Sequence, residues 1–388
     1  MKSKVSSRIL ALDILRGITI AGMLLVNNPG SWGHIYAPFE HSSWNGLTPT
    51  DLIFPFFMFI MGISTYISLR KTAFVFTSAV GLKILRRTLL IWLIGLSVAW
   101  FSLFMRSLFG TDLAALPLLE RLGSAANNFD HLRILGVMPR LAISYGVASL
   151  VALLVKHRYI PYLVAAILVG YFIILMVGNG FATDQTSILW VVDNAILGPN
   201  HMYGAGRIIE PEGIMSTLPA IAHVLLGFCC GRLMMEVKEL HEKVEQLFIM
   251  GAVLTFVGFL LSYGCPINKK IWSPTFVITT CGLASTLLAL LVWVIDIKGH
   301  RVWCRFFESF GVNPLFLYVL GGVISIIIGS VPMPFVAKTI SIKGFIYADL
   351  LQPAFGDLFG SLIFAFLFLS MCWSIGYVLY TKKIYIKI

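Results

Sequence analysis

Ten runs of mostly apolar residues recur along the 388-residue chain and constrain its fold more than any other feature. Each run approaches the roughly 20 residues that a helix needs to cross a bilayer. Because helices satisfy their own backbone hydrogen bonds within lipid, the runs predict an all-α, polytopic membrane protein with about ten transmembrane helices. The runs lie at residues 9–27, 49–69, 84–105, 134–155, 159–178, 215–234, 246–264, 275–296, 307–330 and 358–381.

The composition supports this class of protein. Only 12% of the residues are charged and the mean hydropathy is +0.88, whereas a soluble domain usually carries about a quarter charged residues. The net charge of +11 does not indicate nucleic acid, because Lys and Arg form short clusters between the apolar runs. We therefore expect the lipid bilayer as a partner and no nucleic acid. The six cysteines show no metal-binding spacing, and no metal is predicted.

The distribution of basic residues predicts the orientation. Both termini and the loops on their side of the membrane hold 19 Lys and Arg, whereas the other loops hold 8. Basic loops face the cytoplasm, so the sequence predicts N-in, C-in topology. The basic N-terminus resembles a signal peptide, but its apolar run contains Asp13 and Arg16, and we expect an uncleaved first helix. Residues 1–388 are expected to form a single transmembrane domain.

The first predicted helix carries three polar candidates. Asp13 and Arg16 are three residues apart and share one helical face near the cytoplasmic end. They can form an ion pair that holds helices together, or Arg16 can bind a phosphate from the cytosol. Asn27 lies eleven residues further along the chain, roughly 16 Å along the axis, near the outer end of this helix.

The segment HSSWNGLTPTD leads from the first outer loop into the second predicted helix. Thr48 and Pro49 are typical of an N-cap and a first helical position, and Asp51 of a capping-box acid. Asp51 is also placed where it could orient a neighbouring imidazole. His41 lies just outside the membrane span, where an imidazole can titrate near neutral pH and act as a base or a nucleophile.

Weaker signals occur elsewhere in the chain. Arg140 falls within the predicted helix 134–155, and Asn313 precedes Pro314 at a helix start. Lys269 and its neighbour Lys270 lie on the outer side, where the charge rule disfavours lysine, so we expect them to bind something there.

Several motifs together resemble the heparan-α-glucosaminide N-acetyltransferase family. The resemblance extends from about residue 8 to the C-terminus, and the block at residues 41–62 is highly specific. The sequences of loops 106–132 and 179–210 differ from those of the family. The shared motifs are LDILRG, VNN, HSSWNGLTPTDLIFPFFMFIMG, RILGVMPRLAISYG, HMYG, EPEGIMSTLPAI, NKKIWSPTFV, FGVNPLFLYV and TKKIYIKI, in that order.

The resemblance implies an acyltransferase that moves acetyl from cytosolic acetyl-CoA to the amine of a glucosaminide-like amino sugar across the membrane. The family's active-site histidine matches His41, and an active-site asparagine matches Asn27; Asp51 completes the catalytic group that we expect. Acetyl-CoA is the expected co-substrate, bound by Asp13, Arg16, Arg140 and Asn313. The acceptor is expected to contact Trp44, Asn45, His201, Glu212, Asn268, Lys269 and Trp272.

In this interpretation His41 takes a proton from the attacking amine, and Asn27 or Asn45 donates to the developing oxyanion. An acetyl-histidine intermediate is the rival mechanism. We expect the protein in a bacterial inner membrane, with His41 on the periplasmic side. A homodimer is a further possible assembly. The alternatives are a permease for a sugar or organic anion, disfavoured because no internal repeat is found, and a non-catalytic membrane scaffold.

Overall fold

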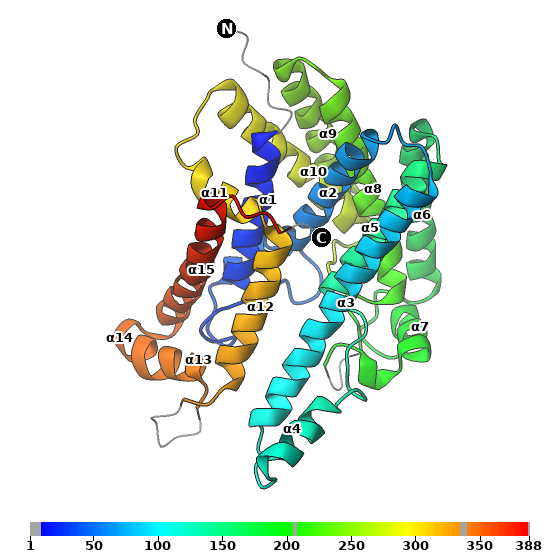
Figure 1. Ribbon diagram of the computed structural model, residues 1–388. Helices are drawn as coiled ribbons and strands as arrows, with labels where there is room; N and C mark the ends of the chain where they lie inside the picture. The colour runs from blue at the N-terminus through cyan, green and yellow to red at the C-terminus, as the bar shows by residue number, and fades with distance from the viewer. Residues whose placement is uncertain (1–8, 205–207, 334–339, 387–388) are drawn as a thin grey trace.

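The computed structural model describes residues 9–204, 208–333 and 340–386, and these residues form a helical bundle without a strand (Figure 1). Eight helices are long and apolar enough to cross a membrane, and a ninth span results if α11 and α12 are counted together. The chain is therefore an integral membrane protein. The helices are α1 (Leu10–Val26), α2 (Pro49–Arg70), α3 (Ser78–Phe109), α4 (Leu118–Ala126), α5 (Val137–Leu154), α6 (Ile160–Val177), α7 (Ile188–Leu197), α8 (Ile214–Glu236), α9 (Leu240–Leu261), α10 (Pro274–Leu291), α11 (Cys304–Gly311), α12 (Pro314–Ser330), α13 (Ile342–Gly344), α14 (Gln352–Phe355) and α15 (Asp357–Thr381).

Each predicted apolar run contains a helix, but two runs differ from a simple span. The run 307–330 is broken, because Pro314 starts a new helix and α12 is bent by 82° from α11. Helix α1, within the run 9–27, has 17 residues and is shorter than the spanning helices. The helix starts predicted at Thr48-Pro49 and Asn313-Pro314 are confirmed.

Helix pairs make up most of the bundle. The closest pairs are α9 with α10, α2 with α8, α3 with α5 and α1 with α11 (Figure 1). At the α1–α11 crossing the backbones touch, since a Cβ on Gly17 would lie 1.9 Å from the carbonyl oxygen of Phe307. A larger residue at position 17 would separate these helices.

In the described part of the chain, the apolar interior consists of one main cluster and three smaller ones. Its main cluster includes Phe59, Met58 and Ile63 of α2 and Phe228 of α8, all buried. The polar candidates gather at two levels of α1. We call the level of Asn27 and the following loop the His41 end of the bundle, and the level of Arg16 the Arg16 end.

Candidate active site

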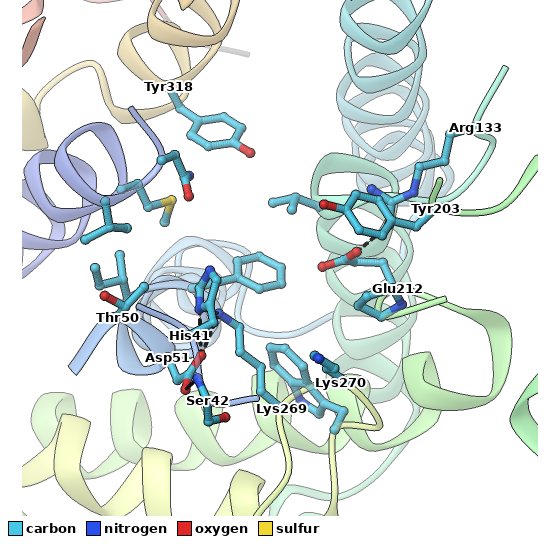
Figure 2. Close-up of a pocket in the computed structure, with 18 residues that line it drawn as sticks. His41, Ser42, Thr50, Asp51, Arg133, Tyr203, Glu212, Lys269, Lys270 and Tyr318 are labelled. Atoms are coloured by element: carbon cyan, nitrogen blue, oxygen red, sulfur yellow. Dashed lines mark hydrogen bonds and ion pairs between the residues drawn. The ribbon is translucent and has the colours of Figure 1, made fainter. Parts of the chain in front are cut away.

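A cavity of about 270 Å³ opens at the His41 end of the bundle. It lies between the C-terminal part of α1, the start of α2 and the loop before α10, and the segments before α5 and α8 close the other side. Figure 2 shows His41, Asp51 and Lys269 on one wall and Arg133, Tyr203 and Glu212 on the other. Six residues predicted for catalysis or acceptor binding line this cavity: Asn27, His41, Asp51, Glu212, Lys269 and Trp272.

His41 and Asp51 form the central contact. Nδ1 of His41 lies 2.7 Å from Oδ1 of Asp51. The Asp51 side chain is fully buried, whereas that of His41 is 45% exposed. Because a carboxylate accepts, this contact favours the tautomer with the proton on Nδ1. Nε2 of His41 then presents a lone pair, and no described residue forms a hydrogen bond with it.

Asp51 also closes the start of α2. Its second oxygen, Oδ2, accepts hydrogen bonds from the backbone N–H of Thr48 at 3.2 Å and from the Thr48 hydroxyl at 3.1 Å. The same oxygen accepts from the N–H of Ser42 at 3.1 Å. Both sequence interpretations of Asp51 therefore apply, because one oxygen caps the helix and the other holds the imidazole.

Lys269 approaches the same pair from the loop before α10. Its Nζ lies 3.3 Å from Oδ1 of Asp51 and 3.2 Å from Nδ1 of His41. Burial lowers the pKa of Lys269, although the negative charges of Asp51 and Glu212 oppose the shift. The ammonium therefore balances the buried carboxylate and brings a positive charge to the cavity wall.

Asn268 shapes the loop that carries Lys269. Its side chain is buried, donating from Nδ2 to Oδ1 of Asn45 at 3.1 Å and accepting from the N–H of Ile271. The loop then turns at Trp272, whose positive φ of 53° directs the chain into α10. Asn268 and Asn45 bond to each other and do not line the cavity.

Two further acceptor candidates also lie outside the cavity lining. The Trp44 ring faces Nζ of Lys270 at 5.8 Å. Nδ1 of His201 bonds to the carbonyl oxygen of Leu132 at 2.7 Å and thereby holds the segment before α5. Each lies near a residue that lines the cavity: Trp44 near Lys270, and His201 two residues before Tyr203 in the chain.

The opposite wall contains an ion cluster that the sequence did not predict. Arg133 pairs with Glu210 and Glu212, and its guanidinium lies 4.5 Å from the centre of the Tyr203 ring. Burial opposes the charge on Arg133, but the two carboxylates raise its pKa. The topology predicted from the sequence assigns Arg133 to an outer loop, where the charge rule disfavours arginine, so the signal used for Lys269 also applies to Arg133.

Arg140, which we expect from the sequence to bind the nucleotide together with Arg16, is separated from Arg16 in the structure. It lies in the first turn of α5, at the His41 end. The side chain is fully buried, contacts the hydroxyl of Ser216 and lies 5.0 Å from the centre of the Trp272 ring. The reason is the direction of the chain, because α5 begins at this end and its first residues lie close to the cavity.

The remaining donor-site candidates lie at the Arg16 end. Arg16 contacts Oδ1 of Asp13 at 2.9 Å, the Ser64 hydroxyl at 2.9 Å and the carbonyl oxygen of Gly311 at 3.4 Å. Asn313 donates to the carbonyl oxygen of Ile384 and accepts from the N–H of Ile386, so it holds the C-terminal segment. The structure thus brings Asp13, Arg16 and the α11–α12 junction together.

Two curated proteins match the chain over most of its length. It is 26% identical over 376 residues to the heparan-alpha-glucosaminide N-acetyltransferase of Mus musculus, covering 81% of this chain and 53% of that protein. It is 27% identical over 379 residues to the Homo sapiens protein of the same name, covering 82% and 53%. The chain spans about half the length of these relatives, and no family model matches it. Together with the sequence motifs, these similarities support a family relationship between this chain and the heparan-α-glucosaminide N-acetyltransferases.

Proposed function

We propose that this chain is a transmembrane acetyltransferase that moves acetyl from acetyl-CoA to the amine of an amino sugar in the cavity around His41. One observation carries the proposal: the 2.7 Å contact to Asp51 fixes the His41 imidazole and leaves Nε2 facing an open cavity. The similarity to two N-acetyltransferases supplies the reaction class. A histidine held by a buried carboxylate is suited to proton transfer in acyl transfer.

In the proposed reaction the neutral amine attacks the thioester carbonyl, and Nε2 of His41 accepts a proton from the nitrogen. The C–N bond forms, the C–S bond breaks, and the imidazolium returns the proton to the leaving thiolate. Asp51 holds the ring and stabilises its positive charge. Asn27, which lines the cavity, is placed to donate to the oxyanion, and Lys269 adds positive charge. Asn45 is less suited, because it does not line this cavity.

The donor is proposed to come from the cytosol along α1. A small apolar cavity of about 10 Å³ adjoins the catalytic cavity at Met23, Val137 and Tyr318. It extends between α1, α2, α5 and α12 towards the Arg16 end. Because the cavity is so small, the helices must move apart before a pantetheine arm can pass along this route. Arg16 is the proposed phosphate contact, and a bacterial inner membrane with His41 on the periplasmic side is the proposed setting.

Purified protein in nanodiscs tests the proposal when it is mixed with acetyl-CoA and a panel of amino sugars and the products are measured by mass spectrometry. We expect N-acetylated sugar, and a loss of at least about 100-fold in turnover for His41→Ala. His34→Ala is the matched control, because His34 lies in the same loop but bonds to Tyr347 outside this cavity. Turnover of His41→Ala within a few-fold of wild type would remove His41 from the mechanism. An acetylated His41 peptide formed without acceptor would indicate the covalent route.

A further inference from the structure

A groove leads from the catalytic cavity along the facing sides of α3 and α12. A cavity of about 230 Å³ shares Met23, Asn27 and Tyr318 with the catalytic cavity. It shares Ser325 and Ile326 with a third cavity of about 460 Å³ at the ends of α3 and α12. We call these two cavities together the α3–α12 groove. The two helices pack side by side (Figure 1), so the groove lies between two neighbouring helices of the bundle.

Small residues keep this groove open. Along α12 the lining includes Gly322, Ser325 and Gly329, which recur on one helical face. A Cβ at Gly329 would meet no heavy atom within 4 Å, and one at Gly322 would meet only Val98 of α3 at 3.8 Å. From Tyr318 to Ser330 the groove follows about 18 Å of helix. This length accommodates a short saccharide rather than a single sugar.

The far end of the groove carries one cation. Arg106 lies in the last turn of α3 and is exposed, and it is the only charged residue among the described residues that line the groove. Trp100 precedes it on α3, and tryptophan is typical of the membrane–water interface. A place in the last turn of this long apolar helix agrees with the depth of lipid headgroups, where a guanidinium binds phosphate well.

We propose that the α3–α12 groove admits an acceptor carried on a lipid phosphate. The phosphate binds Arg106, the lipid chain stays in the bilayer beside α3, and the saccharide follows the groove until its amine reaches His41. This inference rests on the proposed acetyltransferase function and names its substrate class. A soluble amino sugar would need neither an opening between two helices nor a cation at headgroup depth.

The test compares two acceptors in nanodiscs with acetyl-CoA, namely free glucosamine and a glucosamine-terminated trisaccharide joined through phosphate to farnesol. We expect kcat/KM for the farnesyl acceptor to exceed that for glucosamine by at least about ten-fold, because binding to the bilayer and to Arg106 raises its effective concentration. Arg106→Gln and the groove-filling Ser325→Trp should each lower this preference at least about ten-fold, whereas Arg106→Lys keeps most of it. Leu93→Trp, on an exposed face of α3, is the matched control for added bulk.

Turnover of free glucosamine should be unchanged in these variants, which also shows that they fold. Equal kcat/KM for the two acceptors, or a preference unaffected by Arg106→Gln and Ser325→Trp, overturns the groove proposal and leaves the acetyltransferase intact. If neither acceptor is acetylated, the proposed function fails instead. Native mass spectrometry with farnesyl phosphate then decides on the groove: weaker binding to Arg106→Gln supports it, and equal binding to both proteins refutes it.

Discussion

Nζ of Lys269 lies 3.3 Å from Oδ1 of Asp51, the same carboxylate oxygen that contacts the His41 imidazole at 2.7 Å. One buried carboxylate therefore faces a lysine and a histidine at once. The ammonium balances the negative charge of Asp51 without occupying Nε2 of His41. In the proposed reaction, we therefore expect activity to depend on the protonation of Lys269.

As the pH rises, activity should begin to fall at a lower pH than it would if Lys269 had the pKa of an ordinary lysine. Burial places the pKa of Lys269 below its ordinary value of 10.5, so the ammonium loses its proton early as the pH rises. The cavity then loses the positive charge that stabilises the oxyanion. In Lys269→Arg the charge persists, and the alkaline limb of the pH–rate profile should move to higher pH. Lys270→Arg is the control, and identical alkaline limbs in Lys269→Arg and wild type would contradict the prediction.

The two roles of Asp51 should separate by mutation. Asp51→Asn keeps the size of the side chain but removes its charge and replaces one of its two acceptor oxygens by a donor, which disturbs the hold on the imidazole and leaves Lys269 unbalanced, so kcat should fall at least about 100-fold. Thr48→Val removes a hydroxyl that caps α2 and donates to Asp51, at a cost of about 1 kcal/mol in stability, with kcat within a few-fold. Turnover and thermal unfolding of both variants check this. If the two changes had equal effects on kcat, Asp51 would act only as the cap of α2 and would have no separate role in the reaction.

Local sequence predicted the His41–Asp51 contact because the two residues are close in the chain. Thr48 and Pro49 fix the first residue of α2, and this start places Asp51 in the first turn beside the preceding loop. Lys269 is separated from His41 by 228 residues, so its charge could be noticed in the sequence but its position could not. Arg133 meets Glu210 across 77 residues of chain, and the pairing depends on how α5 and α8 pack.

The sequence is less informative about the end of the bundle at which each helix begins and about where helices break. The sequence does not show at which end of the bundle Arg140 lies, whereas in the structure α5 begins close to the cavity and carries Arg140 in its first turn. The hydropathy of run 307–330 does not reveal the 82° bend, since apolar residues continue on both sides of Asn313. The bend follows from Pro314 and from packing of α11 against α1.

Asp193 should make stability depend on pH. It lies in α7, is fully buried and accepts from the N–H of Ile214 at 2.8 Å at the start of α8. Burial raises its pKa from 3.8 to about 6, so the folded protein binds this proton more tightly than the unfolded chain. Protonated Asp193 therefore contributes to the free energy of unfolding at low pH. This contribution, at most roughly 3 kcal/mol, is lost as the pH rises from about 4 to about 6.

Asp193→Asn should remove this part of the pH dependence. The unfolding temperature in detergent, measured for both proteins below and above this window, checks the prediction. Asp184→Asn changes an exposed aspartate and serves as the control. The same pH dependence in wild type and Asp193→Asn would exclude Asp193 as its source.

The orientation of the chain should be measurable at two exposed positions. Tyr36 lies in the loop at the His41 end and Lys383 follows α15, and both are exposed, so burial does not limit labelling. In a cysteine-free background, Tyr36→Cys should react with an impermeant maleimide in intact cells, and Lys383→Cys only after permeabilisation. The 19 Lys and Arg on one side against 8 on the other motivate this expectation. The reverse pattern would overturn N-in, C-in topology and the cytosolic source of acetyl-CoA.

Replacement of Arg16 should weaken CoA binding far more than acceptor binding. The guanidinium contacts Asp13 and Ser64 at 2.9 Å each, so it can hold the bundle together as well as bind phosphate. We expect Arg16→Ala to lower CoA affinity at least about ten-fold, because an arginine–phosphate contact is charge-assisted.

The Asp13→Ala/Arg16→Ala double variant separates the two roles. If the ion pair were the whole function of Arg16, removing both charges would relieve an unpaired carboxylate and restore affinity. If Arg16 contacts phosphate, the double variant binds CoA as poorly as the single one. Ser64→Ala removes a hydrogen bond to Arg16 but keeps its charge, and it should bind CoA nearly as wild type does. Calorimetric titration of CoA into the three variants measures this, and recovery in the double variant would end the phosphate assignment.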